Sequence, residues 1–444
     1  MSYRERLLDR ECATGRPVRV GLVGAGQMGR GFVAQVRRIS GMEVVAVADI
    51  DPGRATGALR AAGQDAVATG DDLDRLSGVV AEGGTVATTD STLLTALPVD
   101  MVIDATGVPE IGARVALRSL LSGRHVGLLN VETDATVGWL LSRIAARSSA
   151  VYTLCRGDEP AEALKLVEYA RDLAFDVVCA GKGKNNPLRP HATAAELAGE
   201  AARKRMNPKM LASFVDGSKA MIEMAALANA ADLGVGGRGL SGHRATVSTL
   251  HEVFRPSADG GILDRPGVVD FATGPVAPGV FVVVRSDEHT VVEEMEYLSM
   301  GPGPYFSFYR PFHLASIEAP LSVPAAVLDH RADIAPQAWR AEVAAAAKRP
   351  LHEGEAIDGI GGDCVYGVID DAATARSEGL VPLGLLAGAR VTRRVEMDEL
   401  IRHDDVEIDS GTTIAQLRAL QDQLLDGHPF DSGHVLGFPA VPAA

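Results

Sequence analysis

The sequence is poor in cysteine and lacks a long apolar segment. Its four cysteines are too few and too scattered for a disulfide framework or a zinc ribbon. A run of about 18 apolar residues, which a transmembrane helix needs, does not occur. The first residues, MSYRERLLDRE, have no apolar core of the kind that a secretory signal carries. We therefore expect a cytoplasmic protein with reduced thiols and no membrane partner.

Positive charge is also scarce, and lysine is the scarcest basic residue. The formal net charge of −15 argues against binding to nucleic acid or anionic membranes, because both need a basic surface. Only seven of the 43 basic residues are lysines, and five of these seven lie between residues 182 and 219. Eight basic residues stand against three acidic ones from 181 to 219. This local excess suits a small anionic substrate, such as a phosphate or a carboxylate.

A glycine-rich motif follows the first strong apolar run. The stretch VRVGLVGAGQMGRG (18–31) predicts a strand, a tight turn and a helix, and EVVAVADI (43–50) predicts a second strand. This context favours dinucleotide binding over an ordinary βα turn, because the glycines admit the turn, the pyrophosphate and close helix packing. Later strands and their ends complete the site, since ligands bind beyond the carboxyl ends of parallel strands. The predicted cofactor-binding residues are Gly24, Gly26, Gln27, Met28, Gly29, Asp49, Thr106, Gly107, Asn130 and Glu132.

Two residues bear on the choice of cofactor. Asp49 ends the second predicted strand, where an acid accepts hydrogen bonds from the adenosine ribose and favours NAD. Arg54 lies close enough in sequence to serve the 2′-phosphate of NADP, so both cofactors stay open. Glu132 is equally suited to a cofactor contact and to the first turn of a helix.

A further βαβ-like passage leads to the lysines. Residues 151–160 end a strand, Pro160 opens a helix, FDVVCA (175–180) predicts the next strand, and AGKGKNN (180–186) predicts its exit loop. By the same geometric rule this loop faces the cofactor crevice. We predict Lys182 and Lys184 as catalytic residues. Asn185 and Asn186 are predicted to bind substrate.

A strongly apolar helix is predicted after Asn207, which acts as N-cap with Pro208 at the first helical position. At 100° per residue its polar side chains fall on one stripe: Lys209, Ser213, Asp216, Lys219 and Glu223. A buried helix must turn such a stripe towards a wet cavity or a network of ion pairs. The cavity interpretation makes Asp216, Lys219 and Glu223 catalytic and Lys209 substrate-binding. The alternative is a set of i,i+3 and i,i+4 pairs that satisfy one another.

The remainder of the chain offers weaker signals. Residues 260–318 predict a β-rich segment, whose aromatic stretch PYFSFYRPF either lines a pocket with Tyr309 and Arg310 or forms a core strand. His243, His251 and His313 lack a metal-ligand spacing, and we interpret them as structural.

The predicted fold class is α/β in three domains. A doubly wound Rossmann domain with an N-terminal helix covers 1–155, and an α+β catalytic and oligomerisation domain covers 156–322. A small β-rich domain covers 323–410, and 411–444 form a C-terminal tail.

With these motifs in view, the chain resembles the 1-deoxy-D-xylulose 5-phosphate reductoisomerase-like proteins, relatives of homoserine dehydrogenase that carry a C-terminal SAF domain. The resemblance covers nearly the whole chain and rests most strongly on three motifs: AGKGKNNPLRP, NPKMLASFVDGSKAMIEMAALANA and GPGPYFSFYRPFHL. It implies a SAF-like domain from about 323 to 410. It also implies reduction and rearrangement of 1-deoxyxylulose 5-phosphate to methylerythritol phosphate with NADPH, a step of isoprenoid biosynthesis.

Several alternatives stay open beside this resemblance. A homoserine dehydrogenase-like enzyme for a hydroxy acid would use Lys182 or Lys219 as a proton donor, oriented by Asp216. A non-catalytic NAD(P)-binding sensor would leave the polar stripe without a substrate. We also expect a homo-oligomer, a dimer or a tetramer. A divalent ion, Mg²⁺ or Mn²⁺, is compatible with oxygen ligands from an acidic set: Glu132, Asp158, Glu159, Asp216 and Glu223.

Overall fold

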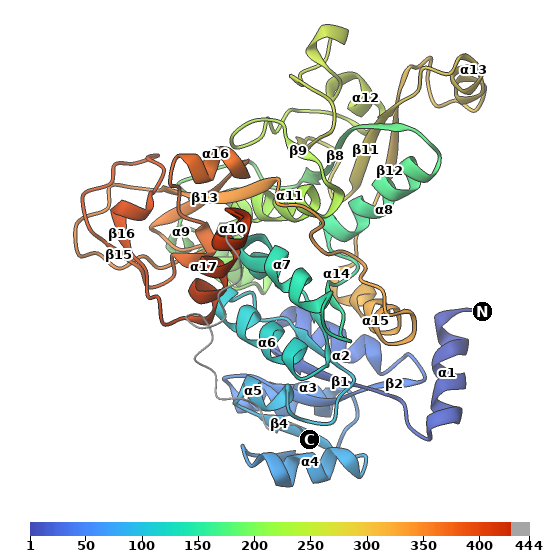
Figure 1. The fold of residues 1–444 in the computed structure, drawn as a ribbon, viewed down its shortest axis with the longest axis vertical. Coiled ribbons are helices and arrows are strands. Elements are labelled where there is room, and N and C mark those ends of the chain that lie inside the picture. Colours follow the sequence, from blue (N-terminus) through green and yellow to red (C-terminus); the bar gives the residue numbers. More distant parts are fainter. Residues whose placement is uncertain (428–444) are drawn as a thin grey trace.

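The computed structural model describes residues 1–427 and arranges them in three regions, coloured blue, green to yellow, and orange to red in Figure 1. The first is built on a parallel sheet, the second on a mixed sheet, and the third on small antiparallel sheets. The predicted α/β fold class is confirmed. Residues 428–444 of the predicted tail lie outside the described part.

The first region has a sheet of parallel strands in the order β3-β4-β2-β1-β5-β6-β7. Its strands are β1 (Val18–Val23), β2 (Met42–Ala48), β3 (Val67–Thr69), β4 (Thr85–Thr88), β5 (Met101–Asp104), β6 (His125–Leu128) and β7 (Tyr152–Leu154). Its helices are α1 (Tyr3–Thr14), α2 (Gln27–Val36), α3 (Pro52–Ala61), α4 (Leu73–Ala81), α5 (Ser91–Leu94), α6 (Pro109–Leu121) and α7 (Val131–Ala145). The strand order reverses beside β1, so the carboxyl ends of β1 and β5 flank a crevice where doubly wound sheets bind ligands.

The second region has a mixed sheet in the order β12-β11-β8-β10-β9. Its strands are β8 (Asp176–Lys184), β9 (Gly234–Val235), β10 (Val268–Thr273), β11 (Val280–Arg285) and β12 (Tyr305–Arg310). Its helices are α8 (Glu159–Asp172), α9 (Ala194–Lys204), α10 (Pro208–Val215), α11 (Ser218–Ala231), α12 (Leu250–Val253), α13 (His289–Tyr297), α14 (Ala315–Glu318) and α15 (Ser322–Asp329). Helices α8 and α11 pack beside each other and against the strands of this sheet.

Strand β8 corrects two predictions. It lies in the second sheet and does not extend the Rossmann sheet. It also runs through Lys184, so Lys182 and Lys184 are strand residues and not part of an exit loop. The glycines beside them allow close backbone packing, since a Cβ at Gly181 would lie 1.9 Å from the Asp270 carbonyl oxygen and one at Gly183 2.2 Å from the Ala277 nitrogen.

The predicted helix after Asn207 is two helices. Asn207 caps α10 as expected, with its side chain accepting from the Lys209 N–H. The chain then breaks at Gly217, whose φ of +94° lies in the left-handed region, and α11 begins at Ser218. The predicted polar stripe is therefore divided, with Lys209 and Ser213 on α10 and Lys219 and Glu223 on α11.

The third region contains β13 (Ala341–Ala347) paired with β14 (Val365–Asp371), β15 (Arg390–Val391) paired with β16 (Val406–Glu407), and the helix α16 (Ala372–Ser377). The chain then forms α17 (Thr413–Leu425), so the start of the predicted tail is an ordered helix. It packs on α7 and α6 of the first region. The Glu110 carboxylate accepts the Thr413 N–H at 3.2 Å and the Ile414 N–H at 2.9 Å.

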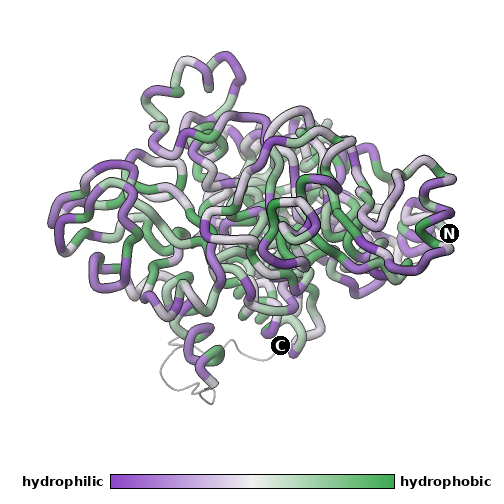
Figure 2. The backbone as a smooth tube through the Cα atoms, turned by 90° about the horizontal axis from the view of Figure 1, so that it is seen from above, coloured by the Kyte–Doolittle hydropathy of each residue, from purple (hydrophilic) through white to green (hydrophobic). Residues whose placement is uncertain are grey.

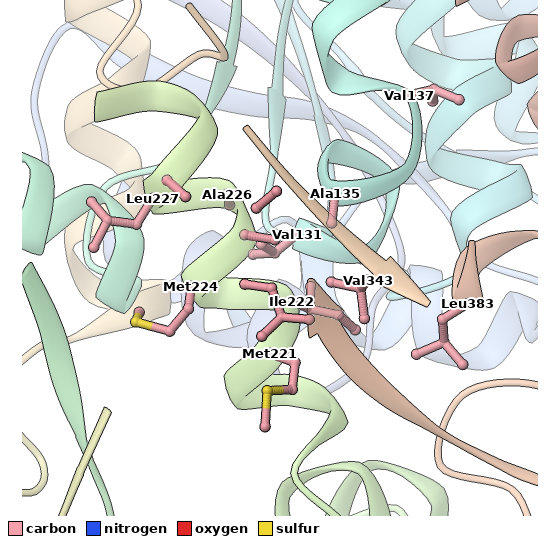
Figure 3. Packing of buried hydrophobic residues seen from close by; sticks show 14 of the residues in the cluster. Val131, Ala135, Val137, Met221, Ile222, Met224, Ala226, Leu227, Val343 and Leu383 are labelled. Carbon is pink, nitrogen blue, oxygen red and sulfur yellow. The ribbon is translucent and has the colours of Figure 1, made fainter. Parts of the chain in front are cut away.

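Helix α11 lies where the regions meet. Figure 3 shows its Ile222 near Val131 of α7 and Val343 of β13, within one buried hydrophobic cluster. All of its residues except Lys219 are buried, which confirms a buried helix here. Figure 2 shows the hydrophobic stretches gathered inside the molecule and the hydrophilic ones on outer loops. Within residues 1–427, no helix has the length and apolar character that crossing a bilayer requires.

Candidate active site

Two cavities adjoin each other between the first and second regions. The cofactor crevice, about 1140 Å³, lies at the carboxyl ends of the Rossmann strands and includes Gly24 to Met28 and Asp49 in its wall. The substrate cavity, about 260 Å³, is lined by residues of the second region, among them Glu159, Lys182 and His313. Met206, between α9 and α10, lines both cavities.

The glycine-rich loop has the geometry that the motif predicts. Gly24 has a φ of +93°, in the left-handed region. A Cβ at Gly29 would lie 1.9 Å from the Gly24 carbonyl oxygen, whereas one at Gly26 would meet open space. Helix α2 begins at Gln27 without a side-chain cap, so its first N–H groups are available to an anion. The loop thus leaves room and donors for a pyrophosphate.

Asp49 has a contact that sequence reasoning missed. Its carboxylate accepts the Ala25 N–H at 2.7 Å and the Asp51 N–H at 2.9 Å, and so holds the glycine-rich loop. It also lines the cofactor crevice together with four arginines: Arg30, Arg54, Arg114 and Arg205. If Asp49 also accepts hydrogen bonds from the ribose, as predicted, its carboxylate serves both the ribose and these two backbone N–H groups.

The other predicted cofactor residues separate into two groups. Thr106 lines the cofactor crevice. Gly107, Asn130 and Glu132 are not among the residues that line it. Asn130 caps α7 and donates to Asp104 at 2.8 Å and to the Val108 carbonyl at 3.0 Å. Burial raises the pKa of Asp104 to about 6, with the Asn130 bond acting in the opposite direction. Asn130 therefore supports the loop behind the crevice.

A buried ionic cluster lies between α7, α8, β8 and α11. Lys182 Nζ is 2.5 Å from Glu159 Oε1 and also contacts Glu223 Oε2. Lys219 Nζ is 3.0 Å from Glu132 Oε1 and 4.0 Å from Glu223 Oε1. Four acids and two lysines form this cluster, which we call the site cluster: Glu132, Asp158, Glu159, Glu223, Lys182 and Lys219.

Burial and charge set the protonation of the cluster. Burial alone would lower the pKa of Lys182, but Glu159 and Glu223 outweigh it and leave that pKa above its usual value. For Glu159, burial is outweighed by Lys182 and His313, so its pKa is well below its usual range. Burial and the neighbouring Glu159 raise the pKa of Asp158 well above normal. The cluster therefore offers a carboxylate and a carboxylic acid side by side.

Lys184 lines the substrate cavity as well, but its pKa is shifted in the opposite direction to that of Lys182. Burial, reinforced by the charge of Lys182, lowers the pKa of Lys184 to about 8. Its Nζ donates to the carbonyls of Asn186 at 2.9 Å and Phe214 at 2.7 Å. An ammonium has three N–H donors, so one is left for an anion in the cavity. Asn185 and Asn186 line the cavity next to it.

Lys209 and Asp216 lie apart from the site cluster. Lys209 is exposed and its Nζ donates to the Asp358 carbonyl at 3.2 Å. Asp216 is buried, accepts the Ser218 N–H at 2.8 Å and pairs with Lys348 at 2.8 Å. The expectation that Asp216 orients Lys182 or Lys219 is therefore wrong, because Lys348 of the third region already occupies its carboxylate.

His313 joins the site although we interpreted it from sequence as structural. Its Nδ1 lies 2.7 Å from the Pro278 carbonyl, which can only accept, so Nδ1 carries the proton. Its Nε2 lies 3.5 Å from Glu159 Oε1 at the cavity wall. The pairing of β12 with β11 and of β11 with β8 places Arg310, Val280 and Lys182 in one row. A prediction of that pairing from the sequence would have placed His313 beside Lys182.

A family model matches the middle of the chain. Residues 157–319 match the family model described as the catalytic domain of oxidoreductase DRL. This range contains Asp158, Glu159, Lys182, Lys219, Glu223 and His313. No curated protein sequence matched the chain.

Solved structures resemble the chain at a distance. A myo-inositol dehydrogenase from Lactobacillus casei is 14% identical, with 73% of this chain and 90% of that chain covered and a TM-score of 0.43. A probable dehydrogenase from Thermotoga maritima is 13% identical, covering 72% and 91%, with a TM-score of 0.39. A 1-deoxy-D-xylulose 5-phosphate reductoisomerase from Zymomonas mobilis is 13% identical, covering 71% and 82%, with a TM-score of 0.37. Likenesses this distant carry no argument about function.

The glycine-rich crevice, the Rossmann-type sheet and the matched catalytic domain together define the class. The chain is an NAD(P)-dependent oxidoreductase.

Proposed function

We propose that the chain is a reductoisomerase acting on a phosphosugar such as 1-deoxy-D-xylulose 5-phosphate. The observation that supports this most is the substrate cavity, whose wall contains both acid–base groups and anion-binding groups. Glu159, Lys182 and His313 form the first set, and Lys184, Asn185 and Asn186 form the second. The cavity adjoins the cofactor crevice at Met206, so a substrate held there would lie near a nicotinamide.

The anion-binding side would hold the phosphate of the substrate. Lys184 has one N–H left after its two carbonyl bonds, and the amides of Asn185 and Asn186 add neutral donors. A compact ammonium with rotatable donors suits a phosphate at the end of a flexible substrate. The scarcity of lysine elsewhere in the chain agrees with a dedicated role here.

The acid–base side would perform the rearrangement and the reduction. Lys182 would donate to the substrate carbonyl oxygen, and a carboxylate of the site cluster would accept the proton of the neighbouring hydroxyl. One carbon–carbon bond breaks and another forms, which leaves a branched aldehyde. A nicotinamide held in the cofactor crevice would supply the hydride that reduces this aldehyde, and the site cluster would supply the proton for the aldehyde oxygen.

A divalent metal is assigned no step. Asp158, Glu159 and Glu223 offer carboxylate oxygens within 4.8 Å of one another, which is the donor type that Mg²⁺ and Mn²⁺ prefer. However, Lys182 already bridges two of these three carboxylates. The donor set therefore does not fit a resident metal ion.

We propose NADPH as the preferred cofactor. Asp49 is bonded to two backbone N–H groups, and Arg54 lies beside it in the crevice wall with three further arginines in the same wall. An arginine at this position accommodates a 2′-phosphate. Tighter binding of NADH than of NADPH in a fluorescence titration would contradict this choice.

The second candidate is a homoserine dehydrogenase-like enzyme for a hydroxy acid. Lys182 supports it as well, because one ammonium donating to a carbonyl oxygen is sufficient for hydride transfer without rearrangement. The SAF assignment of residues 323–410 belongs to both proposals, and the small antiparallel sheets of this region are compatible with it.

Incubation with 1-deoxy-D-xylulose 5-phosphate and either nicotinamide cofactor distinguishes the two candidates. The reductoisomerase proposal expects oxidation of the reduced cofactor with formation of a branched polyol phosphate. A chain that oxidises no cofactor with this substrate but does so with an oxo acid is a simple dehydrogenase.

A further inference from the structure

The lysines of the site cluster lie where a metal ion would be expected among three carboxylates. The oxygen atoms of Asp158, Glu159 and Glu223 are within 4.8 Å of one another. The ammonium of Lys182 contacts Glu159 Oε1 at 2.5 Å and Glu223 Oε2 more closely. Because Mg²⁺ binds carboxylate oxygens at about 2.0–2.1 Å, an ion that bound both of these oxygens would overlap the ammonium.

Glu223 is paired on both of its oxygens. Oε2 contacts Lys182, and Oε1 lies 4.0 Å from Lys219 Nζ. Glu223 is 1% exposed, so both pairs lie in a low-dielectric interior where charges are poorly screened. A metal ion would meet a carboxylate whose charge two ammonium groups already share.

The backbone holds Lys182 in this position. It stands in the middle of the sheet, opposite Phe271 of β10 on one side and Val280 of β11 on the other. Its side chain is 6% exposed. Lys219 approaches from α11, a separate element, and is anchored by Glu132 at 3.0 Å. Two independent elements thus bring positive charge to one shared carboxylate, Glu223.

We infer that Lys182 and Lys219 replace a divalent metal in this active site, and that the enzyme neither binds nor needs Mg²⁺ or Mn²⁺ there. The inference rests on the proposed function for its chemical meaning: the third N–H of Lys182 polarises the substrate oxygen that a metal would otherwise hold. No covalent bond to either lysine is involved.

Mn²⁺ titration of the metal-stripped protein, followed by the electron paramagnetic resonance signal of free Mn²⁺, tests the inference without any substrate. Wild type is expected to bind no stoichiometric Mn²⁺ at this site. Lys182→Met removes the ammonium and keeps an unbranched side chain one atom shorter, and it is expected to bind one Mn²⁺ per chain. Addition of Glu223→Gln to Lys182→Met is expected to abolish that binding.

Two outcomes overturn the inference. One is a stoichiometric Mn²⁺ in wild type that Glu223→Gln removes, a result that decides the matter even if Lys182→Met fails to fold. The other is a folded Lys182→Met protein that binds no Mn²⁺, because Lys182 then is not what excludes the ion. Absence of turnover with a phosphosugar would defeat the proposed function and leave the Mn²⁺ result standing.

Discussion

Lys348 and Lys182 are both buried beside acidic groups, but their ammonium groups have different partners. Lys348 lies just after β13, is 1% exposed in its side chain, and reaches Asp216 at 2.8 Å and the carbonyls of Ala192 and Gly362 at 2.8 and 2.7 Å. Its ammonium thus donates to two carbonyls and forms an ion pair with one carboxylate. Lys182 is almost as buried but contacts two carboxylates at the wall of a cavity. A saturated ammonium holds structure, whereas one with a donor left beside a cavity is available for chemistry.

The two lysines also act at different places in the molecule. Lys348 joins the third region to the break between α10 and α11, and residues of α10 line the substrate cavity. The third region therefore contributes to the site indirectly. Lys182 lies in the site itself.

The largest expected effect is the loss of turnover in Lys182→Met. Removal of a donor aimed at a developing oxyanion costs about 10²–10³-fold in kcat, and we expect a loss of about 10³-fold here. Affinity for NADPH, measured by fluorescence, should stay within about twofold. Lys165→Met is the matched control and should keep its activity. It removes a lysine of α8 whose Nζ lies 3.2 Å from Glu162 Oε1. Equal turnover in Lys182→Met and wild type would remove Lys182 from the mechanism.

Lys348→Met should instead destabilise the protein. It leaves the buried Asp216 without its partner, and such losses cost about 3–5 kcal/mol. We expect a lower midpoint of urea unfolding for this variant. The double variant Asp216→Asn with Lys348→Met should recover most of the loss, because neither charge is then left alone in the interior. A single variant as stable as wild type would contradict the structural role of this pair.

The pH dependence of anion binding should separate Lys184 from an ordinary lysine. Its pKa of about 8 means that the charged form is present below pH 8 and is lost as the pH rises through that value. We expect the inhibition constant of inorganic phosphate to rise about tenfold per pH unit above pH 8. In Lys184→Arg the onset should move to higher pH, since an arginine stays charged. Phosphate inhibition unchanged up to pH 10 in wild type would show that Lys184 does not bind the anion.

The smallest effect is expected at the docked C-terminal helix. Glu110→Gln weakens the acceptor for the first N–H groups of α17 and should cost about 0.5–1 kcal/mol. Amide exchange should become faster in residues 413–417 and not in the Rossmann strands. Unchanged protection there would mean that packing on α6 and α7 is sufficient to hold the helix.

Local patterns in the sequence predicted much of the scaffold. The glycine-rich motif predicted the turn at Gly24 and the close packing at Gly29, because positive φ and a missing Cβ are properties of one residue and its neighbours. Asn207 and Pro208 predicted the start of α10 for the same reason. The excess of lysine drew attention to residues 182–219, and several of these residues line the substrate cavity.

Predictions that needed contacts across the chain were less successful. Lys182 and Lys184 looked like loop residues because only the partners β10 and β11 extend β8 through them. The polar stripe looked continuous because α10 and α11 share one helical pattern, and Gly217 alone did not reveal the break. His313 appeared structural because its neighbour Glu159 is 154 positions away in the sequence.

The sequence by itself determined the class of the first region, the start of the helices and the concentration of lysine, all of which follow from residues close together in the chain. Only the tertiary structure decided which acid each lysine meets. Lys182 pairs with Glu159 and Glu223, and Lys219 pairs with Glu132. Asp216 pairs with Lys348, which comes from another region. Charge pairing in a buried interior depends on which elements pack together, and no local pattern contains that information.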